Sequence, residues 1–154
     1  MIPRVRTCLW FDGNAEAAVA FYTGLLPASE IDRSLRPDPD GPPLVIDFTL
    51  AGTPYQALNG GPHFQLTEAV SISVLTADQA ETDRLWGALT ADGGAESQCG
   101  WLKDRFGLSW QIVPEAVPRL LTSPDRAAAD RVFQALMGMR RIEIAALEAA
   151  AAGA

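Results

Sequence analysis

The sequence predicts an α+β fold made of paired βαβββ modules, whose strands form a curved antiparallel, cup-shaped sheet, with further helices at the C-terminal end. Three observations lead to this prediction. The order strand, helix, strand, strand, strand can be read twice along the chain. Each reading contains a helix start signal, at Asn14 in the first and at Asp78 in the second. After Pro114 the pattern changes to helical spacing.

The first module is predicted over about residues 4–62. Asn14 is a helix N-cap candidate with Glu16 in the first turn, and apolar residues follow at helical spacing up to Pro27. The proline-rich segment 36–43 is expected to be a loop, because prolines lack the backbone donor that a sheet needs. The strands predicted around these features are Val5–Phe11, Ser29–Leu35, Leu44–Leu50 and Tyr55–Asn59, the last two joined as a hairpin.

The second module is predicted over about residues 68–114. Its helix begins with a capping box, in which Glu81 follows Asp78 by three positions. The apolar stripe of this helix consists of Thr82, Leu85, Trp86 and Leu89. The strands predicted around it are Val70–Leu75, Ala95–Leu102 and Leu108–Val113.

The two modules are expected to form one domain over residues 1–122. Residues 123–154 are expected to form a helical extension that packs on this domain or on a partner chain. Ser123 and Pro124 suit the N-cap and the first position of a helix. Gly138 separates this helix from a further one over residues 139–152.

The composition indicates a soluble globular protein, with 154 residues, 48% of them hydrophobic, and a net charge of −7. Nucleic acids and anionic membranes are not expected as partners, because both need clustered Lys and Arg. No apolar run is long enough to span a bilayer, and the N-terminus lacks the apolar stretch of a signal peptide. Cys8 and Cys99 are too few for a disulfide scaffold. We therefore expect a cytoplasmic protein.

Residues 99–114 read CGWLKDRFGLSWQIVP, and this segment closely resembles the signature of PhnB-like proteins. Shorter matches are WFDGNAEAA at 10–18, ALNGGP at 57–62 and VFQALM at 132–137. PhnB-like proteins belong to the glyoxalase/bleomycin-resistance/extradiol dioxygenase (vicinal oxygen chelate) superfamily and are often named 3-demethylubiquinone-9 3-methyltransferase-like. The resemblance covers nearly the whole chain and implies the paired βαβββ fold.

The resemblance also implies where a metal would be held. Relatives such as glyoxalase I and extradiol dioxygenases bind a divalent metal inside the cup, through His, Glu and Gln on the first, fourth, fifth and eighth strands. The matching positions in this chain are Thr7, Gln56 or Leu58, Ser71 or Ser73, and Gln111. Hydroxyl and amide groups are poor ligands for a transition metal, which prefers imidazole, carboxylate or thiolate. We therefore expect neither a metal nor another cofactor.

Several other residues could carry chemistry, but each has a plainer interpretation. His63 is the only histidine and is expected to be a solvated loop residue. Cys99 has no histidine next to it in the sequence, so both it and Cys8 are expected to pack. Lys103 and Asp104 lie in a strand-to-strand turn, where a solvated charge pair and an Asp turn contact are expected.

Two tryptophans and a glutamine near this turn are candidates for ligand contact. Trp101 and Trp110 could stack on a flat ligand or pack between helix and sheet, and the sequence leaves both possibilities open. Gln111 is the strongest candidate for the cup interior, because strand alternation sets it opposite Ile112 and its amide both donates and accepts hydrogen bonds.

These observations predict that the protein binds a small, partly apolar metabolite in the cup without a metal. The predicted binding residues are Thr7, Gln56, Ser71, Ser73, Trp101, Trp110 and Gln111. Two alternatives stay open: a metal-dependent lyase, isomerase or oxygenase of the same superfamily, and a ligand-free structural or regulatory dimer. A homodimer is expected, since PhnB-like relatives commonly pair through their sheet edges. Ubiquinone methylation with S-adenosylmethionine is not expected, because no Gly-rich loop leads from a strand into a helix.

Overall fold

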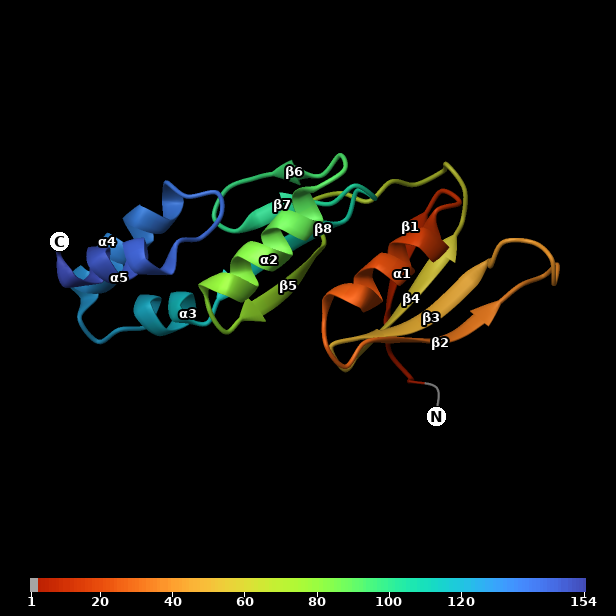
Figure 1. Cartoon of the computed structure of the whole chain (residues 1–154), viewed down its shortest axis with the longest axis horizontal. Helices are drawn as coiled ribbons and strands as arrows, with labels where there is room; N and C mark the ends of the chain where they lie inside the picture. Colours follow the sequence, from red (N-terminus) through yellow and green to blue (C-terminus); the bar gives the residue numbers. More distant parts are fainter. Residues whose placement is uncertain (1–2) are drawn as a thin grey trace. The chain divides into compact units, whose positions relative to one another are not determined.

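The structure is a computed structural model that describes residues 3–154. The chain divides into two compact units, the first ending at Leu66 and the second running from Thr67 to Ala154. Each unit contains one four-stranded sheet with a helix on one face, and the second unit also contains the C-terminal helices (Figure 1). The predicted α+β class, with helices at the C-terminal end, is confirmed.

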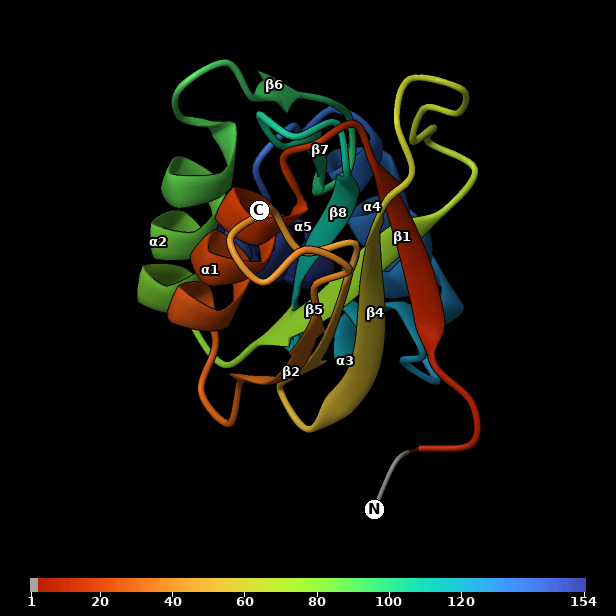
Figure 2. The same ribbon diagram turned by 90° about the vertical axis from the view of Figure 1, so that its right-hand side faces the viewer.

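The first unit contains one βαβββ module. Its elements are β1 (Thr7–Phe11), α1 (Ala15–Leu25), β2 (Glu30–Leu35), β3 (Val45–Leu50) and β4 (Thr53–Asn59). The strand order in the sheet is β1-β4-β3-β2, and β1 runs parallel to β4, beside which it lies in Figure 2. The sheet is therefore mixed, where the sequence predicted an antiparallel one. The chain reverses direction after each of β1, α1, β2 and β3. This is an even number of reversals, so β4 points the same way as β1.

The second unit repeats this arrangement. Its elements are β5 (Ser71–Thr76), α2 (Gln79–Thr90), β6 (Ala95–Glu96), β7 (Trp101–Lys103) and β8 (Ser109–Pro114). The strand order is β5-β8-β7-β6, with β5 parallel to β8 and the other pairs antiparallel. The two modules thus share one topology, although their sequences differ.

The predicted single strand over residues 95–102 is wrong, because this segment is a hairpin formed by β6 and β7. Cys99 and Gly100 both have left-handed backbones, with φ of 55° and 83°, and the chain turns back there. The Trp101 N–H donates to the Gln98 carbonyl at 3.0 Å. A side chain at Gly100 would lie 2.7 Å from the Ile112 carbonyl oxygen, so only glycine fits without a shift. This turn supplies the third consecutive strand of the second module.

Each helix packs on one face of its own sheet, and we call the opposite face the open face of that unit. In the first unit α1 buries Ala15, Ala18, Val19 and Tyr22 on the sheet face that carries Leu9, Phe11, Ile46, Phe48 and Ala57. In the second unit α2 buries the predicted stripe of Thr82, Leu85, Trp86 and Leu89 on the face that carries Ile72, Leu102, Trp110 and Ile112.

The two module helices begin differently. The predicted start of α2 is present with one difference from a capping box: the Asp78 carboxylate accepts the Glu81 N–H at 2.8 Å, but the Glu81 carboxylate accepts the N–H of Ala77, the residue before the N-cap, at 2.8 Å. The side chain of Asn14 makes no cap hydrogen bond to α1. Asn59 on β4 accepts the Ala15 N–H at 3.0 Å instead, so the N-terminus of α1 is capped by a residue far away in the sequence.

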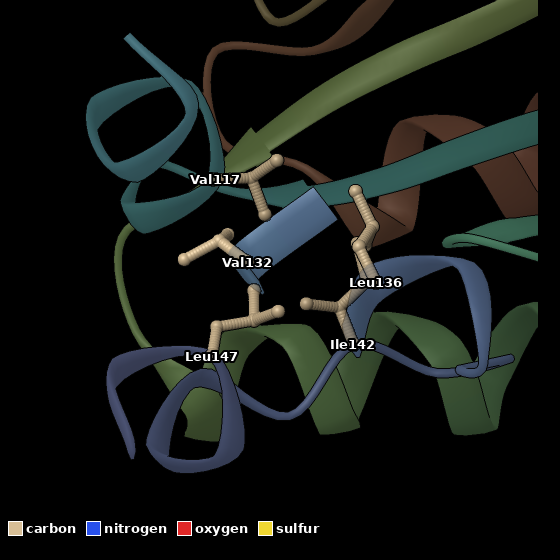
Figure 3. Close-up of a cluster of buried hydrophobic side chains, with 5 residues drawn as sticks. All are labelled: Val117, Val132, Leu136, Ile142 and Leu147. Carbon is tan, nitrogen blue, oxygen red and sulfur yellow. The ribbon is translucent and has the colours of Figure 1, made fainter. Parts of the chain in front are cut away.

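The C-terminal helices are α3 (Ala116–Leu121), α4 (Arg126–Met137) and α5 (Ile144–Ala152). Buried side chains of these helices, together with Ile142 from the segment between α4 and α5, point toward one another around a common core of Val117, Val132, Leu136, Ile142 and Leu147 (Figure 3). All three helices belong to the second unit. Among residues 3–154, no helix combines the length and the apolar character needed to cross a membrane.

Two sets of hydrogen bonds fix these helices to the second module. The backbone N–H groups of Cys99 and Gly100 donate to the carbonyls of Met139 and Arg140, at 2.8 and 2.7 Å. The Gln79 side chain accepts the Ile144 N–H at 2.8 Å and so caps α5. The N-cap of α4 is Asp125, which accepts the Ala128 N–H at 3.1 Å, and not Ser123 as predicted.

Candidate functional site

The open face of the second unit brings several predicted binding residues together. Residues that are partners in register point to the same face of a sheet, whereas neighbours along a strand alternate. Ser73 is the partner of Gln111, and Gln111 is also the partner of Trp101. The residues on this face are Ser71, Ser73, Leu75, Trp101, Lys103, Ser109, Gln111 and Val113. The predicted residues Ser71, Ser73, Trp101 and Gln111 therefore share one surface.

The polar groups on this face are uncharged near its centre. The Gln111 side-chain amide donates to the Ser71 hydroxyl at 2.9 Å. Ser73 and Leu75 are exposed, and Trp101 is half-buried. An amide, hydroxyls, an indole and an aliphatic side chain thus lie within one surface, which suits a ligand that is partly polar and partly apolar.

Trp110 does not belong to this surface, and its predicted contact with a ligand does not fit the structure. Its side chain is completely buried on the face that packs against α2. The indole N–H donates to the Asp104 carboxylate at 2.8 Å. Strand alternation places Trp110 and Gln111 on opposite faces, so only one of these two neighbours can face a ligand.

Asp104 is buried, where the sequence predicted a solvated carboxylate, but the predicted turn contact is confirmed. Besides the Trp110 indole, its carboxylate accepts the N–H groups of Phe106 at 2.8 Å and Leu108 at 3.1 Å. Lys103 forms an ion pair with Glu68 and not with Asp104. Asp104 therefore serves the fold, and the neighbouring Lys103 stays at the surface.

Sequence reasoning missed Ser109, which lies on the open face opposite Lys103. Its side chain is 1% exposed, and its hydroxyl has no hydrogen-bond partner among residues 3–154. Leaving a buried polar group unsatisfied costs about 1–3 kcal/mol. A hollow of about 210 Å³ adjoins it, lined also by Trp101, Lys103 and Glu68. Strand alternation could assign the face of Ser109, but only the folded structure reveals its burial.

On the open face of the first unit, Gln56 has Cys8 and Asp47 as its register partners. Thr7, predicted to line the same surface, is the partner of Tyr55 and lies on the face that carries α1. Thr7 therefore lies on the opposite face of the sheet from Gln56, one position away from a residue of the open face. Because side chains in a strand alternate with period two, a shift of one residue moves the side chain to the other face.

Gln56 lies within a charged cluster built around Asp47, which is 8% exposed. The Asp47 carboxylate accepts the Gln56 amide at 2.9 Å and the Arg33 Nε–H at 3.0 Å, and the Arg6 Nε lies 3.3 Å away. Burial raises the pKa of Asp47, but the hydrogen bonds from Gln56 and Arg33 and the charge of Arg6 outweigh this effect, so the pKa is lower than usual. The Gln56 amide is thus engaged in binding Asp47.

The candidate nucleophiles and metal ligands are dispersed. Cys8 is exposed, so its predicted packing is wrong. Partial burial still raises the pKa of its thiol, which Arg6 opposes and Asp47 reinforces, so this thiol is a weak source of thiolate. The Cys99 sulfur lies 3.5 Å from the Leu136 carbonyl and 3.7 Å from the Met137 sulfur, and His63 is exposed. Over residues 3–154 no three His, Cys, Asp or Glu side chains converge into a potential metal site.

A larger hollow of about 630 Å³ lies where α2 and α5 begin. Its lining includes the carboxylates of Asp78, Glu143 and Glu148. Asp78 caps α2, Glu143 pairs with Arg141, and Glu148 pairs with Arg119. These carboxylates already serve helix ends and ion pairs, so we assign the hollow no ligand.

Comparison with known proteins identifies the family of this chain. Residues 3–113 match the model of the family described as 3-demethylubiquinone-9 3-methyltransferase. The chain belongs to this family. The PhnB protein from Bacillus cereus is 32% identical, with a TM-score of 0.66 over 73% of this chain and 99% of that one. The resemblance to PhnB-like proteins is confirmed.

Another solved structure shares the fold at lower identity. Protein PA1353 from Pseudomonas aeruginosa is 22% identical, with a TM-score of 0.59 over 74% of this chain and 98% of its own. A glyoxalase/bleomycin resistance protein from Albidiferax ferrireducens T118 is 14% identical, with a TM-score of 0.49 over 71% of this chain and 96% of its own. No curated protein matches the chain.

Two of the shorter family motifs meet in the first unit. The Trp10 indole donates to the Gly61 carbonyl at 2.8 Å, and the Gly60 N–H donates to the Phe11 carbonyl at 3.0 Å. A side chain at Gly60 would lie 2.2 Å from the Trp10 ring. The glycine pair therefore lets the backbone approach Trp10, and it is not followed by a helix that could bind a phosphate.

Proposed function

We propose that this member of the PhnB-like family binds a small, partly apolar metabolite on the open face of its second unit, without a metal. The observation that carries the proposal is the composition of that face. Gln111 and Ser71 are joined by a hydrogen bond, Ser73 is exposed, and Trp101 offers aromatic area beside them. Few precisely placed polar groups within an apolar surface are typical of small-molecule sites.

Independence from metal is supported by the residues at the positions that hold a metal in superfamily relatives. Ser71, Ser73 and Gln111 offer hydroxyl and amide oxygens, which bind a transition metal weakly. Gln56 is engaged by the Asp47 carboxylate. None of these positions carries an imidazole, a carboxylate or a thiolate.

We also infer that the methyltransferase name of the family does not describe the activity of this chain. A dinucleotide-like or S-adenosylmethionine site needs a glycine-rich turn that leads from a parallel strand into a helix N-terminus. Gly60 and Gly61 instead accommodate Trp10 and precede a loop.

A thermal-shift screen against a metabolite panel, combined with metal analysis of the purified protein, tests the proposal. We expect at least one panel compound to raise the melting temperature of the wild type, in metal-free buffer. Gln111→Leu should abolish this shift, because the amide that orients the ligand is lost. Gln134→Leu, an exposed position on α4, is the matched control and should retain the shift.

Other outcomes would favour a different function. One tightly held transition-metal ion per chain, with a lower melting temperature after chelation, would favour a metal-dependent lyase, isomerase or oxygenase. An absence of both metal and ligand responses would favour a structural or regulatory dimer.

A further inference from the structure

The hollow of about 210 Å³ on the open face of the second unit has features that define the chemistry of a ligand. Ala95, Trp101 and Leu102 contribute apolar area to its lining, and the polar groups come from Glu68, Glu96, Ser97, Lys103 and Ser109. The Glu96 carboxylate accepts the Trp86 indole N–H at 2.8 Å and pairs with Arg140 at 3.6 Å, which leaves Glu68 as the carboxylate on Lys103. All of these residues belong to the second unit, so the hollow is complete within that unit.

Ser109 supplies a hydroxyl whose hydrogen-bonding capacity is unused. The side chain is 1% exposed and the hydroxyl has no partner among residues 3–154. Ser109 is the register partner of both Lys103 and Ser71, so its side chain points to the same face as theirs. The hydroxyl is closed to solvent, so a ligand atom accepts its hydrogen bond only after a small shift of the neighbouring side chains, and that bond would remove the penalty of leaving the hydroxyl unsatisfied.

Lys103 is the only lysine in the sequence, and its side chain carries an ammonium group. In the structure it pairs with the Glu68 carboxylate, which is contributed by the segment just before β5. The side chains of Lys103 and Glu68 are 39% and 66% exposed. An ion pair this exposed contributes little to stability, so another carboxylate can replace Glu68 on Lys103 at small cost.

We propose that this hollow binds the carboxylate of a small aromatic or otherwise flat acid. The ligand carboxylate would take the place of Glu68, accepting hydrogen bonds from the Lys103 ammonium and the Ser109 hydroxyl, while its body lies against Trp101. The inference rests on the proposed function and adds the chemical class of the ligand. A single cation and a single hydroxyl suit a monocarboxylate, and the position beside Lys103 is already occupied by a carboxylate in the free protein.

Benzoate and its neutral analogue benzamide are suitable probes, with affinities measured by calorimetry on the full chain. We expect Glu68→Gln to bind benzoate about two- to fivefold more tightly than the wild type, because the weakly competing carboxylate is gone. Lys103→Met should weaken benzoate binding at least tenfold, whereas Arg126→Met, with the same change in net charge on α4, should not. Benzamide should not distinguish the wild type from Glu68→Gln.

Ser109→Ala separates a binding role from a structural one. Removal of an unsatisfied buried hydroxyl should leave the melting temperature of the free protein unchanged or higher, while benzoate binding weakens about three- to tenfold. Reductive ¹³C-methylation offers an independent readout, since the one lysine side chain gives a single dimethyl-lysine resonance that benzoate should shift.

The proposal is overturned if benzoate binds no more tightly to Glu68→Gln than to the wild type, or if it does not bind at all. Failure of this inference and failure of the proposed function can be told apart. A neutral panel compound that depends on Gln111 but not on Lys103 would retain the binding function and reject the carboxylate site.

Discussion

Buried polar residues of these sheets stabilise the fold mainly through the hydrogen bonds that their side chains form. Asp104 lies within the most specific family motif, yet its carboxylate satisfies two backbone N–H groups and the Trp110 indole. A residue of the family signature can thus stabilise the fold, while the residue next to it is free to contact a ligand. Lys103, directly before Asp104, is half-exposed.

Asp104→Ala should lower the free energy of unfolding by about 2–4 kcal/mol, because buried donors lose a charged acceptor. Urea unfolding, followed by far-UV circular dichroism, measures this loss. Asp130→Ala removes an exposed carboxylate from α4 and should change stability by no more than about 0.5 kcal/mol. Equal effects of the two substitutions would contradict the role assigned to Asp104.

Asp47 should make stability dependent on pH in the acid range. Its pKa in the folded protein is lowered, so the stabilisation by the ionised carboxylate is present above the ordinary Asp value, about 3.9, and is lost as the pH falls through the lower folded pKa. Asp47→Asn should therefore cost about 1–3 kcal/mol near neutral pH, and the difference from the wild type should shrink below about pH 4.

Urea unfolding of both proteins at a series of pH values measures this difference. Asp32→Asn, an exposed position on β2, serves as the control. A difference between wild type and Asp47→Asn that stays constant down to about pH 2 would rule out a titrating role of Asp47.

At the scale of elements, helix ends and turns are decided by partners that can be near or far in the sequence. The start of α2 was predicted from Asp78 and Glu81, which are neighbours on the same helix. The start of α1 depends on Asn59, which lies 44 positions beyond Ala15 and also donates to the Pro43 carbonyl at 2.7 Å. A local capping rule cannot identify such a residue.

Asn59→Ala should lower the free energy of unfolding by about 1–2 kcal/mol, because the Ala15 N–H and the Pro43 carbonyl both lose a partner. Asn14→Ala should cost less than about 0.5 kcal/mol, since that side chain makes no cap hydrogen bond. Thermal and urea unfolding of the two variants compare them directly. If Asn14→Ala proved the more damaging, the remote cap would be wrong.

At the scale of the whole molecule, both units use the same topology with different surfaces. The open face of the first unit carries the charged cluster around Asp47, whereas that of the second carries Ser71, Ser73 and Gln111. Each unit also presents sheet edges, and every residue of the edge strand β2 is exposed. An exposed edge offers backbone groups for pairing with another chain.

The expected homodimer is a prediction at this scale. Sedimentation velocity at micromolar concentration should give twice the mass of the chain. If the β2 edge takes part, Ile31→Lys should shift the protein toward the monomer, whereas Phe133→Lys on α4 should not; both positions are about half exposed. A single-chain mass for the wild type at all accessible concentrations would exclude the dimer.

The sequence by itself determined the stripe of α2, the family, and the order of the elements outside the β6–β7 hairpin and α3. These features depend on residues that are close together along the chain, or on a long contiguous motif. It also predicted that Gln111 and Ile112 point to opposite faces, because alternation within a strand is a local property, whereas the placement of Ser71 and Ser73 beside Gln111 followed from the resemblance to the family. The tertiary structure decided the β6–β7 hairpin, the exclusion of Thr7 and Trp110, and the burial of Ser109. Strand register, remote capping and unsatisfied burial arise only when distant segments pack, so no local pattern could determine them.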